Sequence, residues 1–362
     1  MSSQANLATD WRAGYGPIAH RSETIERMQA LVQRLVAQRR IADEASAHAL
    51  LAAADRVACT AMSVVAHMTY ARRIDRSGCP LGSDDFKQTP EGHTGGSLNM
   101  VPAFVGYLLT NALTGTTRGW LMGQGHCVAA IEAVNALTGD VSAAQRGRYD
   151  RSEAGLSRLI GDFYSYAIDK QGRPAVPLGS HAGPNTAGAI SEGGYLGFAG
   201  LQYVHTPLPG ESLVAFLSDG AFEEQRGSDW APRWWRAEDC GFAIPVMILN
   251  GRRIEQRTQI VQEGGAAWLA EDLRHNGFDP VIVDGRDPVA IAWAIVEAED
   301  TLSAFAARSD RRYPVKLPYV IAETEKGFGF PGAATNAAHN LPLNGNPRED
   351  AQAREAFNAG AA

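Results

Sequence analysis

The second half of the chain contains four short runs of almost uninterrupted apolar residues, each ending in a polar segment. The runs are Leu213–Leu217, which leads into Ser-Asp-Gly, Pro245–Leu249, which leads into Asn-Gly, Val281–Val283, which leads into Asp-Gly, and Tyr319–Ala322. Strands that are apolar on both sides are typical of parallel sheets with helices on both faces. We therefore predict an α/β fold with a doubly wound, mostly parallel sheet. Ligands of such sheets bind at the carboxyl ends of the strands, where these polar segments lie.

Helical patterns precede this region and also occur within it. Apolar residues recur at helical spacing from Ile25 to Val36, and an alanine-rich stretch runs from Glu44 to Arg73. Asp287 and Pro288 form an N-cap followed by a favoured first helical residue. The glycine-rich middle, residues 78–200, is typical of a catalytic region built from loops. We predict an N-terminal helical segment over residues 1–75, an α/β domain over 76–345 and a C-terminal tail over 346–362.

The composition excludes several classes of function. The formal net charge is −7, so the chain offers no general basic surface for nucleic acid or for an anionic membrane. The four cysteines are scattered, which favours small buried thiols in a reducing compartment over disulfides or a zinc site. The N-terminus lacks the pattern of a signal peptide, and no apolar run approaches the ~20 residues of a membrane span. We expect a cytoplasmic protein.

Asp219 and Asn250 each follow an apolar strand, and the interval between them leaves room for one crossover helix. The two strand ends can therefore be neighbours. The Asp219 carboxylate, the Asn250 amide oxygen and a backbone carbonyl just beyond are hard oxygen donors of the kind that Mg²⁺ prefers. Gly220 would let the backbone approach a diphosphate closely. The alternative is that both dipeptides are simply turns after strands.

Ser218-Asp219-Gly220 followed by Leu249-Asn250-Gly251 resembles the signature of thiamine diphosphate (ThDP) enzymes, which begins with Gly-Asp-Gly and ends in an Asn. The sequence departs from that signature at Ser218, which is not a metal ligand. The resemblance implies that Asp219, Asn250 and the carbonyl of Arg252 bind Mg²⁺ against the diphosphate of the cofactor.

Six further segments resemble transketolases and phosphoketolases, in the same order as in that family, and the closest similarity is to phosphoketolases. They are Gly92–Gly96, Gly123–His126, Ser180–His181 with Ser191–Gly197, His275–Phe278 with Val283–Pro288, Lys326–Gly329 and Ala338–Leu343. The resemblance implies that residues 76–345 form the diphosphate-binding domain. The residues it places at the cofactor are Gly125, Gly193, Gly194, Leu196, Gly220 and Glu223. Glu223 could steer Asp219, or it could be an ordinary acidic partner of a helix start.

Four histidines lie in the matched segments: His93, His126, His181 and His339. Cleavage of a ketose by ThDP chemistry requires proton transfer near neutral pH, which suits histidine, with its unperturbed pKa of about 6.5. We predict that these four are catalytic, although a loop histidine is often only a solvated or capping residue. The remaining histidines are interpreted as structural or surface residues: His20, His48, His67, His205 and His275.

Relatives with one long chain carry a pyrimidine domain after the diphosphate domain, and it supplies the Glu that protonates the cofactor. No match to that domain occurs here, so we expect a separate pyrimidine-domain subunit, in an α₂β₂ assembly that acts on a sugar phosphate. Trp230, Trp234 and Trp235 are candidates for the interface, or alternatively for core packing. Two other functions stay open: an epimerase or isomerase of pentulose phosphates, and a non-catalytic binding or regulatory subunit.

Overall fold

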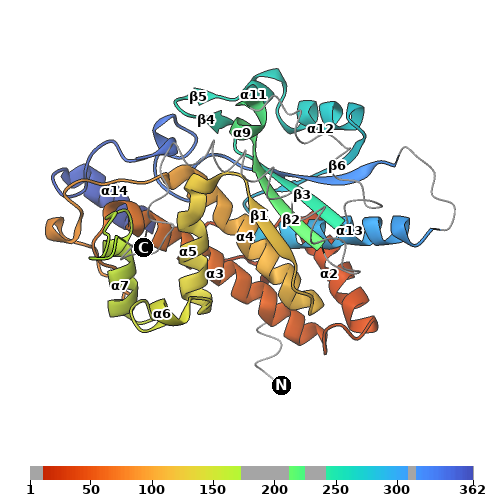
Figure 1. Ribbon diagram of the computed structural model, residues 1–362, viewed down its shortest axis with the longest axis horizontal. Coiled ribbons are helices and arrows are strands. Elements are labelled where there is room, and N and C mark those ends of the chain that lie inside the picture. Colours follow the sequence, from red (N-terminus) through yellow and green to blue (C-terminus); the bar gives the residue numbers. More distant parts are fainter. Residues whose placement is uncertain (1–10, 173–211, 225–241, 309–314, 362) are drawn as a thin grey trace.

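The computed structural model describes residues 11–172, 212–224, 242–308 and 315–361. Within these ranges the chain forms a five-stranded sheet with helices on both faces (Figure 1). A separate two-stranded hairpin, β4 (Arg252–Arg253) with β5 (Gln256–Arg257), follows the third strand.

All neighbouring strands of the large sheet run parallel, in the order β1-β2-β3-β7-β6. Their bounds are β1 Gly119–Met122, β2 Ser212–Ser218, β3 Phe242–Leu249, β6 Phe278–Asp284 and β7 Leu317–Glu323. The last four contain the four apolar runs, so the predicted parallel α/β sheet is confirmed. The sequence did not indicate β1, because this edge strand is short and only Met122 in it is buried.

The helices that were predicted from caps and periodicity are present. The first two are α2 (Ser22–Ala37) and α3 (Glu44–Tyr70). Helix α13 (Pro288–Ala306) begins where predicted, because the Asp287 carboxylate accepts hydrogen bonds from the N–H groups of Val289 (2.8 Å) and Ala290 (3.3 Å). The N-terminal helical segment therefore precedes the α/β fold as expected.

The glycine-rich middle is more helical than its composition suggested. It contains α4, α5, α6 and α7, with bounds Thr94–Thr114, Val128–Thr138, Ala143–Arg146 and Glu153–Asp162. Helix α4 is buried along nearly its whole length and packs against both α3 and α13. The prediction of a region built mainly from loops was wrong for these residues, because glycines at the start of α4 permit close packing and do not interrupt the helix.

Helix α3 is long and apolar enough to cross a membrane by length and composition alone. This differs from the expectation that no apolar run approaches the length of a membrane span. More than half of its apolar window (56%) is buried inside the protein, and the helix packs against α4 and α5. This burial is typical of the core helix of an α/β domain.

Helices cover the two faces of the sheet unequally. Figure 1 shows α4 and α13 on one side of the strands and α11 (Gln259–Glu263) with α12 (Ala266–His275) on the other. The C-terminal helix α14 (Ala351–Ala361) packs against α3, where the Phe357 ring contacts Tyr70 and Phe86. The region predicted as a tail is thus a packed helix.

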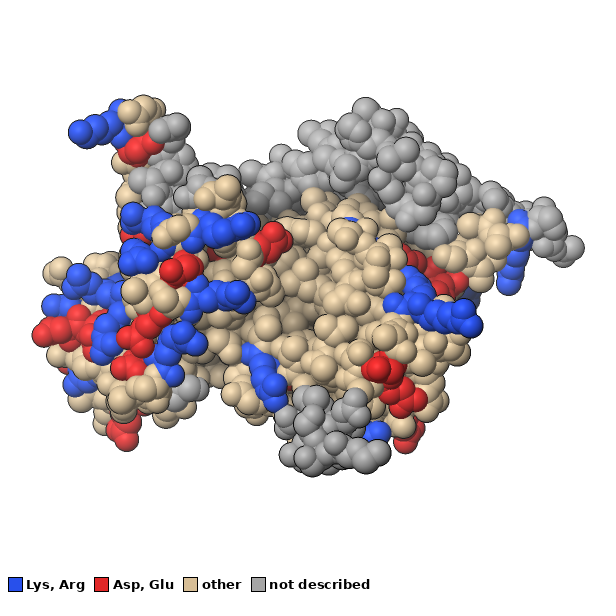
Figure 2. Space-filling model, turned by 90° about the horizontal axis from the view of Figure 1, so that it is seen from below, with Lys and Arg blue, Asp and Glu red and all other residues tan. Residues whose placement is uncertain are grey.

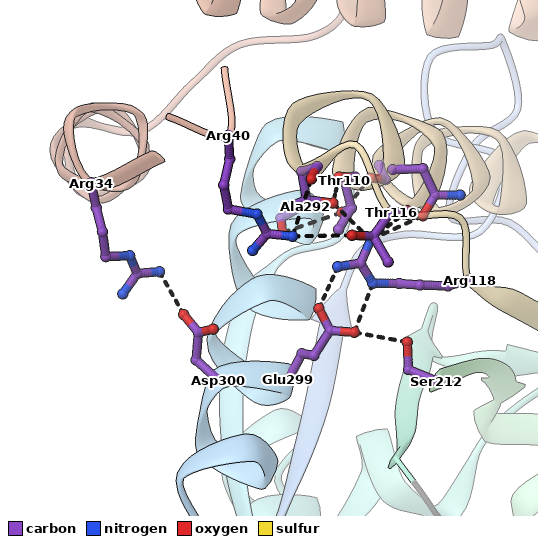
Figure 3. A network of polar contacts seen from close by, with 12 residues as sticks. Arg34, Arg40, Thr110, Thr116, Arg118, Ser212, Ala292, Glu299 and Asp300 are labelled. Atoms are coloured by element: carbon purple, nitrogen blue, oxygen red, sulfur yellow. Dashed lines mark hydrogen bonds and ion pairs between the residues drawn. The ribbon is translucent and has the colours of Figure 1, made fainter. Parts of the chain in front are cut away.

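At the amino ends of β1 and β2, a buried polar network ties α13 to the sheet (Figure 3). The Arg118 guanidinium precedes β1 and donates to both carboxylate oxygens of Glu299 on α13. Glu299 also accepts a 2.7 Å hydrogen bond from the Ser212 hydroxyl at the start of β2. This network lies at the opposite end of the strands from the residues predicted to bind a cofactor.

Candidate active site

Asp219 lies at the carboxyl end of β2, where α9 (Asp219–Glu224) begins, and its side chain is completely buried. Its Oδ2 accepts hydrogen bonds from the N–H of Gly251 (2.7 Å) and from the hydroxyl of Thr258 (3.3 Å). Its Oδ1 accepts from the N–H of Gly220 (3.1 Å). Because β2 and β3 are parallel neighbours, the two polar strand ends meet here, as the sequence predicted.

Burial raises the pKa of Asp219 to about 7, although the N–H of Gly251 and the charge of Lys326 act in the opposite direction. The ionised form of a carboxylate that is so strongly desolvated is stabilised by a nearby cation. A bound metal ion would therefore favour the ionised form.

The other two predicted metal ligands follow β3 directly. The amide oxygen of Asn250 accepts a 3.1 Å hydrogen bond from the N–H of Arg252. The carbonyl oxygen of Arg252 accepts one from the ammonium of Lys326, also at 3.1 Å. All three oxygen donors thus belong to the ends of two adjacent strands, and their role as metal ligands stays a prediction.

Three of the four predicted histidines come together in space from separate segments. His93 is the N-cap residue of α4, His126 lies in the short 3₁₀ helix Gly125–Cys127, and His339 ends another, Ala337–His339. The ring centroid of His93 lies 5.1 Å from that of His126 and 5.5 Å from that of His339. The ring centroids of His126 and His339 lie 5.9 Å apart. We call these three residues the histidine cluster.

His93 and His339 are buried, His126 is partly buried, and all three imidazoles are neutral near pH 7 because their pKa values are lowered. Burial, with the neighbouring histidines and Lys326, lowers the pKa of His126 to about 3, and burial with Lys326 and His93 does the same for His339. Burial also lowers the pKa of His93. Both ring nitrogens of His93 and Nδ1 of His126 are buried without a hydrogen-bond partner among the described residues. Such nitrogens call for a polar ligand or water.

Lys326 joins the histidine cluster to the loop that carries Arg252. Its Nζ lies 2.8 Å from Nδ1 of His339 and 3.1 Å from the carbonyl oxygen of Arg252. Because a lysine ammonium only donates, Nδ1 of His339 accepts, and the neutral ring carries its proton on Nε2. Burial lowers the pKa of Lys326.

Lys326 lies in the Lys-Gly-Phe-Gly segment, but neither Lys326 nor Thr258 was among the residues predicted to form the site. The motif could have indicated Lys326. No sequence pattern marks Thr258, which lies in the loop after β5 and is fully buried.

Other side chains fix the segments that carry the site. Asn99, inside α4, donates to the carbonyl oxygen of Glu325 (2.7 Å) and accepts from the N–H of Gly327 (3.3 Å), which holds the turn around Lys326. Thr94 donates to the carbonyl oxygen of Asn340 (2.7 Å). Helix α4 therefore organises both the Lys326 and the His339 segments.

Glycines allow this close packing at the start of α4. A Cβ at Gly95 would lie 2.1 Å from the carbonyl oxygen of Ala338, and one at Gly96 would lie 2.7 Å from Sγ of Cys127. Gly125 is buried beside His126, and a Cβ at Gly220 would lie 3.1 Å from Cβ of Arg253. Side chains at Gly95 and Gly96 would push the histidine segments apart.

Glu223 does not steer Asp219 by a direct hydrogen bond. Its Oε1 accepts from the N–H of Ile260 (2.7 Å) in the first turn of α11, and its Oε2 lies 3.7 Å from the Arg253 guanidinium. Glu223 therefore anchors α11 and the β4–β5 hairpin beside the loop. His181, Gly193, Gly194 and Leu196 lie outside the described residues, as do Trp230, Trp234 and Trp235.

The histidines that were interpreted as structural or surface residues differ in their exposure to solvent. His20, His48 and His67 are buried away from the cluster, and His275 is exposed at the end of α12. The imidazole of His20 lies between the carboxylates of Asp55 and Asp287, 3.0 Å from each. His205 lies outside the described residues.

Comparisons with known proteins show the family of the chain. The family model for the XFP N-terminal domain, the N-terminal domain of phosphoketolases, matches residues 46–358. A probable phosphoketolase of Streptomyces coelicolor is 30% identical over 301 residues, covering 75% of this chain and 36% of that protein. A probable phosphoketolase 2 of Lactiplantibacillus plantarum is 26% identical over 287 residues, covering 73% and 34%. The chain thus spans about a third of the length of these relatives.

Among solved structures, the transketolase of Pichia stipitis in complex with sedoheptulose 7-phosphate is similar with a TM-score of 0.48 and 18% identity. The similarity covers 85% of this chain and 44% of that one. The chain belongs to the family of phosphoketolase N-terminal domains, within the ThDP-type enzymes.

Proposed function

We propose that the chain is the diphosphate-binding part of a ThDP- and Mg²⁺-dependent enzyme that cleaves the C2–C3 bond of a ketose phosphate. The observation that carries this proposal is the convergence of the histidine cluster and Lys326 on the loop that contains Asp219. Phosphoketolase chemistry and transketolase chemistry both use such a site. They differ in whether the two-carbon unit passes to phosphate or to an aldose.

The residues present fit the proposed cofactor and metal ion. Asp219, Asn250 and the carbonyl of Arg252 form a hard-oxygen donor set, which suits Mg²⁺ that also binds a diphosphate. The ionised Asp219 carboxylate is fully buried and needs a compensating cation. The unpartnered nitrogens of His93 and His126 need polar atoms from a ligand.

Bound ThDP would supply the carbanion chemistry that adds to and cleaves next to a carbonyl group. The neutral imidazoles of the histidine cluster accept or share the protons of substrate hydroxyl groups. His339, whose Nδ1 accepts from Lys326, offers Nε2–H as a donor to oxygen atoms of the substrate. The burial of His93 and His339 limits the access of water to the reacting atoms.

We further propose that a separate polypeptide supplies the pyrimidine domain, most simply in an α₂β₂ assembly. Such a partner would contribute the Glu that activates the cofactor. An epimerase of pentulose phosphates would use the same site reversibly, and a non-catalytic subunit would bind the cofactor without turnover.

Reconstitution tests both proposals. The chain is purified alone and together with a pyrimidine-domain partner, and ThDP-dependent turnover of fructose 6-phosphate or xylulose 5-phosphate is measured. Acetyl phosphate formation indicates phosphoketolase chemistry, transfer to an aldose indicates transketolase chemistry, and isomerised substrate indicates an epimerase. We expect activity only with the partner. Robust turnover by the isolated chain would overturn the split enzyme, and absence of ThDP binding with and without the partner would overturn the cofactor assignment.

Variants of the histidine cluster test the site within the active assembly. We expect His93→Ala, His126→Ala and His339→Ala each to lower turnover by ~10²-fold or more, while ThDP binding largely survives. His275→Ala is the matched control, because His275 is exposed at the end of α12. If the three cluster variants were as active as this control, their roles in proton transfer would be wrong.

A further inference from the structure

A cavity outside the candidate active site lies beside the segment that leads into His93, and the proposed reaction does not use it. Its volume is about 360 Å³. Its walls come from the segment between α3 and α4, from the end of α7 and from the segment before α14. The lining residues are Arg72, Lys87, Gln88, Thr89, Glu91, Gly161, Phe163, Tyr164, Ser165 and Arg348.

The charge of this cavity is predominantly positive. Arg72, Lys87 and Arg348 line it, against the single carboxylate of Glu91. Glu91 is already engaged by the hydroxyl of Tyr166, which donates to its Oε1 at 2.5 Å. In Figure 2, charged side chains of both signs cover the end of the molecule that carries α7 and α14, while the central face is almost free of charge.

Two of these cations, Arg72 and Arg348, have guanidinium N–H groups that are available to a ligand. The guanidinium of Arg72 has no hydrogen-bond acceptor or ion-pair partner in the part of the chain that the structure describes. Arg348 donates from Nη1 to the carbonyl oxygen of Phe86 (3.1 Å), and its Nη2 lies 3.7 Å from the exposed carboxylate of Asp84. An arginine fork with free N–H groups at a cavity wall matches the geometry of a phosphate or carboxylate group.

Lys87 is held rigidly at the inner end of the same wall. Its Nζ donates to the carbonyl oxygens of Met68 (2.5 Å) and Phe163 (2.8 Å), which leaves one N–H of the ammonium for another acceptor. Burial lowers the pKa of Lys87 to about 8. A half-buried ammonium whose close partners are neutral carbonyls is stabilised when an anion binds beside it.

The wall between this cavity and the histidine cluster is thin. Tyr164 lines the cavity, and its hydroxyl is hydrogen-bonded to the backbone of His93. The Tyr164 ring also packs against Gly92, where an added Cβ would lie 2.8 Å from the ring. Tyr164 itself has a φ of +60°, a left-handed conformation that is uncommon for an aromatic residue and tends to occur at ligand sites. The cavity is therefore separate from the proposed cofactor site and shares a wall with it.

We propose that this cavity, which we call the Arg72 pocket, binds a small phosphorylated anion through Arg72, Lys87 and Arg348. Its volume lies within the range of small-molecule sites, and its hydroxyl and amide groups from Thr89, Ser165 and Gln88 suit the polar remainder of such a ligand. The proposal does not depend on ThDP chemistry. Inorganic phosphate and a sugar phosphate share the recognised group, and the experiment separates them.

The test is calorimetric titration of the full chain with inorganic phosphate, with fructose 6-phosphate and with fructose, in EDTA and without ThDP. Under these conditions a metal-dependent diphosphate site does not contribute. We expect both phosphates to bind and fructose not to bind. Tighter binding of fructose 6-phosphate would identify a sugar phosphate as the ligand, and equal affinities would identify the phosphate group alone.

Variants assign the binding to the Arg72 pocket. Arg72→Gln removes a guanidinium that has no structural partner in the described chain, so the fold should survive, and we expect the affinity for phosphate to fall by about tenfold or more. Arg146→Gln, an exposed arginine of α6, is the matched control, and His126→Ala controls for the histidine cluster. Both should bind phosphate like the wild type. Absence of phosphate binding by the wild type, equal binding by Arg72→Gln, or loss of binding in His126→Ala would overturn the proposal.

Discussion

Replacing Arg118 by Met should destabilise the protein without affecting its ligand sites. The Arg118 side chain is completely buried, and Glu299, its partner on α13, is 16% exposed. Besides Glu299, the guanidinium donates from Nη1 to Asn111 Oδ1 (3.1 Å), to the hydroxyl of Thr114 (3.0 Å) and to the carbonyl oxygen of Thr116 (3.0 Å). Figure 3 shows Arg118 and Glu299 pointing toward each other between α13 and the start of the sheet.

The expected loss follows from what remains after the substitution. Among the described residues, Glu299 then keeps only the hydrogen bond from Ser212 (2.7 Å), and it becomes a nearly buried carboxylate without a cation from that part of the chain. Removing one partner of a buried ion pair costs about 3–5 kcal/mol. Because Glu299 retains some contact with water, we expect the lower part of this range, about 3 kcal/mol. Removing both charges, in Arg118→Met with Glu299→Leu, should cost less than the single substitution.

The assay is equilibrium unfolding in urea, with the free energy of unfolding compared among variants. Arg148→Met is the exposed control, since the Arg148 and Asp162 side chains are 52% and 24% exposed and such pairs contribute at most about 1 kcal/mol. Phosphate and ThDP titrations should be unchanged, because the network lies at the amino ends of the strands. A loss in Arg118→Met no larger than in the control, or a double variant less stable than the single one, would refute this reasoning.

Three further predictions concern charged groups. Burial lowers the pKa of His20, but Asp287 and Asp55 raise it, and the net pKa is about 10. The protonated His20 therefore stabilises the folded protein fully below the unfolded pKa of about 6.5, and this contribution is lost as pH rises toward 10. His20→Gln should accordingly lower the free energy of unfolding most near pH 6 and progressively less up to pH 10, and a pH-independent difference would contradict the ion pair. Asp219→Asn should abolish the increase in ThDP affinity caused by Mg²⁺, measured by calorimetry with and without the metal; an unchanged Mg²⁺ effect would remove the metal assignment. Lys326→Met should raise the pKa of His339, because the Lys326 ammonium adds to burial in lowering it. NMR titration of the His339 imidazole measures this pKa, and an unchanged pKa in the variant would contradict the role of the ammonium.

The sequence predicted those elements whose signal is local. The runs from Leu213 and Pro245 are apolar on both faces because both faces are covered, so they identify central strands directly. Asp287 identifies the start of α13 because capping involves only the next three residues. The pairing of Asp219 with the Asn250 loop followed from the rule that parallel strands end at the same edge.

The features that the sequence did not reveal depend on contacts between distant segments. Thr258 contributes to the site only because the hairpin after β3 folds back onto Asp219. Lys326 becomes important through its distances to His339 and Arg252, which no spacing in the chain specifies. His20 was interpreted as a structural or surface residue, and its burial between two carboxylates is visible only once α3 and α13 are packed. The Arg72 pocket likewise combines three segments that are separated in the sequence.

The charges of the candidate site also limit the proton transfer that its own residues can perform before a ligand binds. Its four inner basic groups, the histidine cluster and Lys326, are all shifted toward their neutral forms, chiefly by burial. Imidazoles with such lowered pKa values accept hydrogen bonds but are weak bases, and none of the three histidines is a cationic proton donor near pH 7. A diphosphate bound at the Asp219 loop would bring negative charge close to Lys326 and raise the pKa values of these bases. Such an increase would make the histidines better proton acceptors for a bound substrate. Activation of the cofactor itself is a separate step, which we propose for the Glu of a partner subunit.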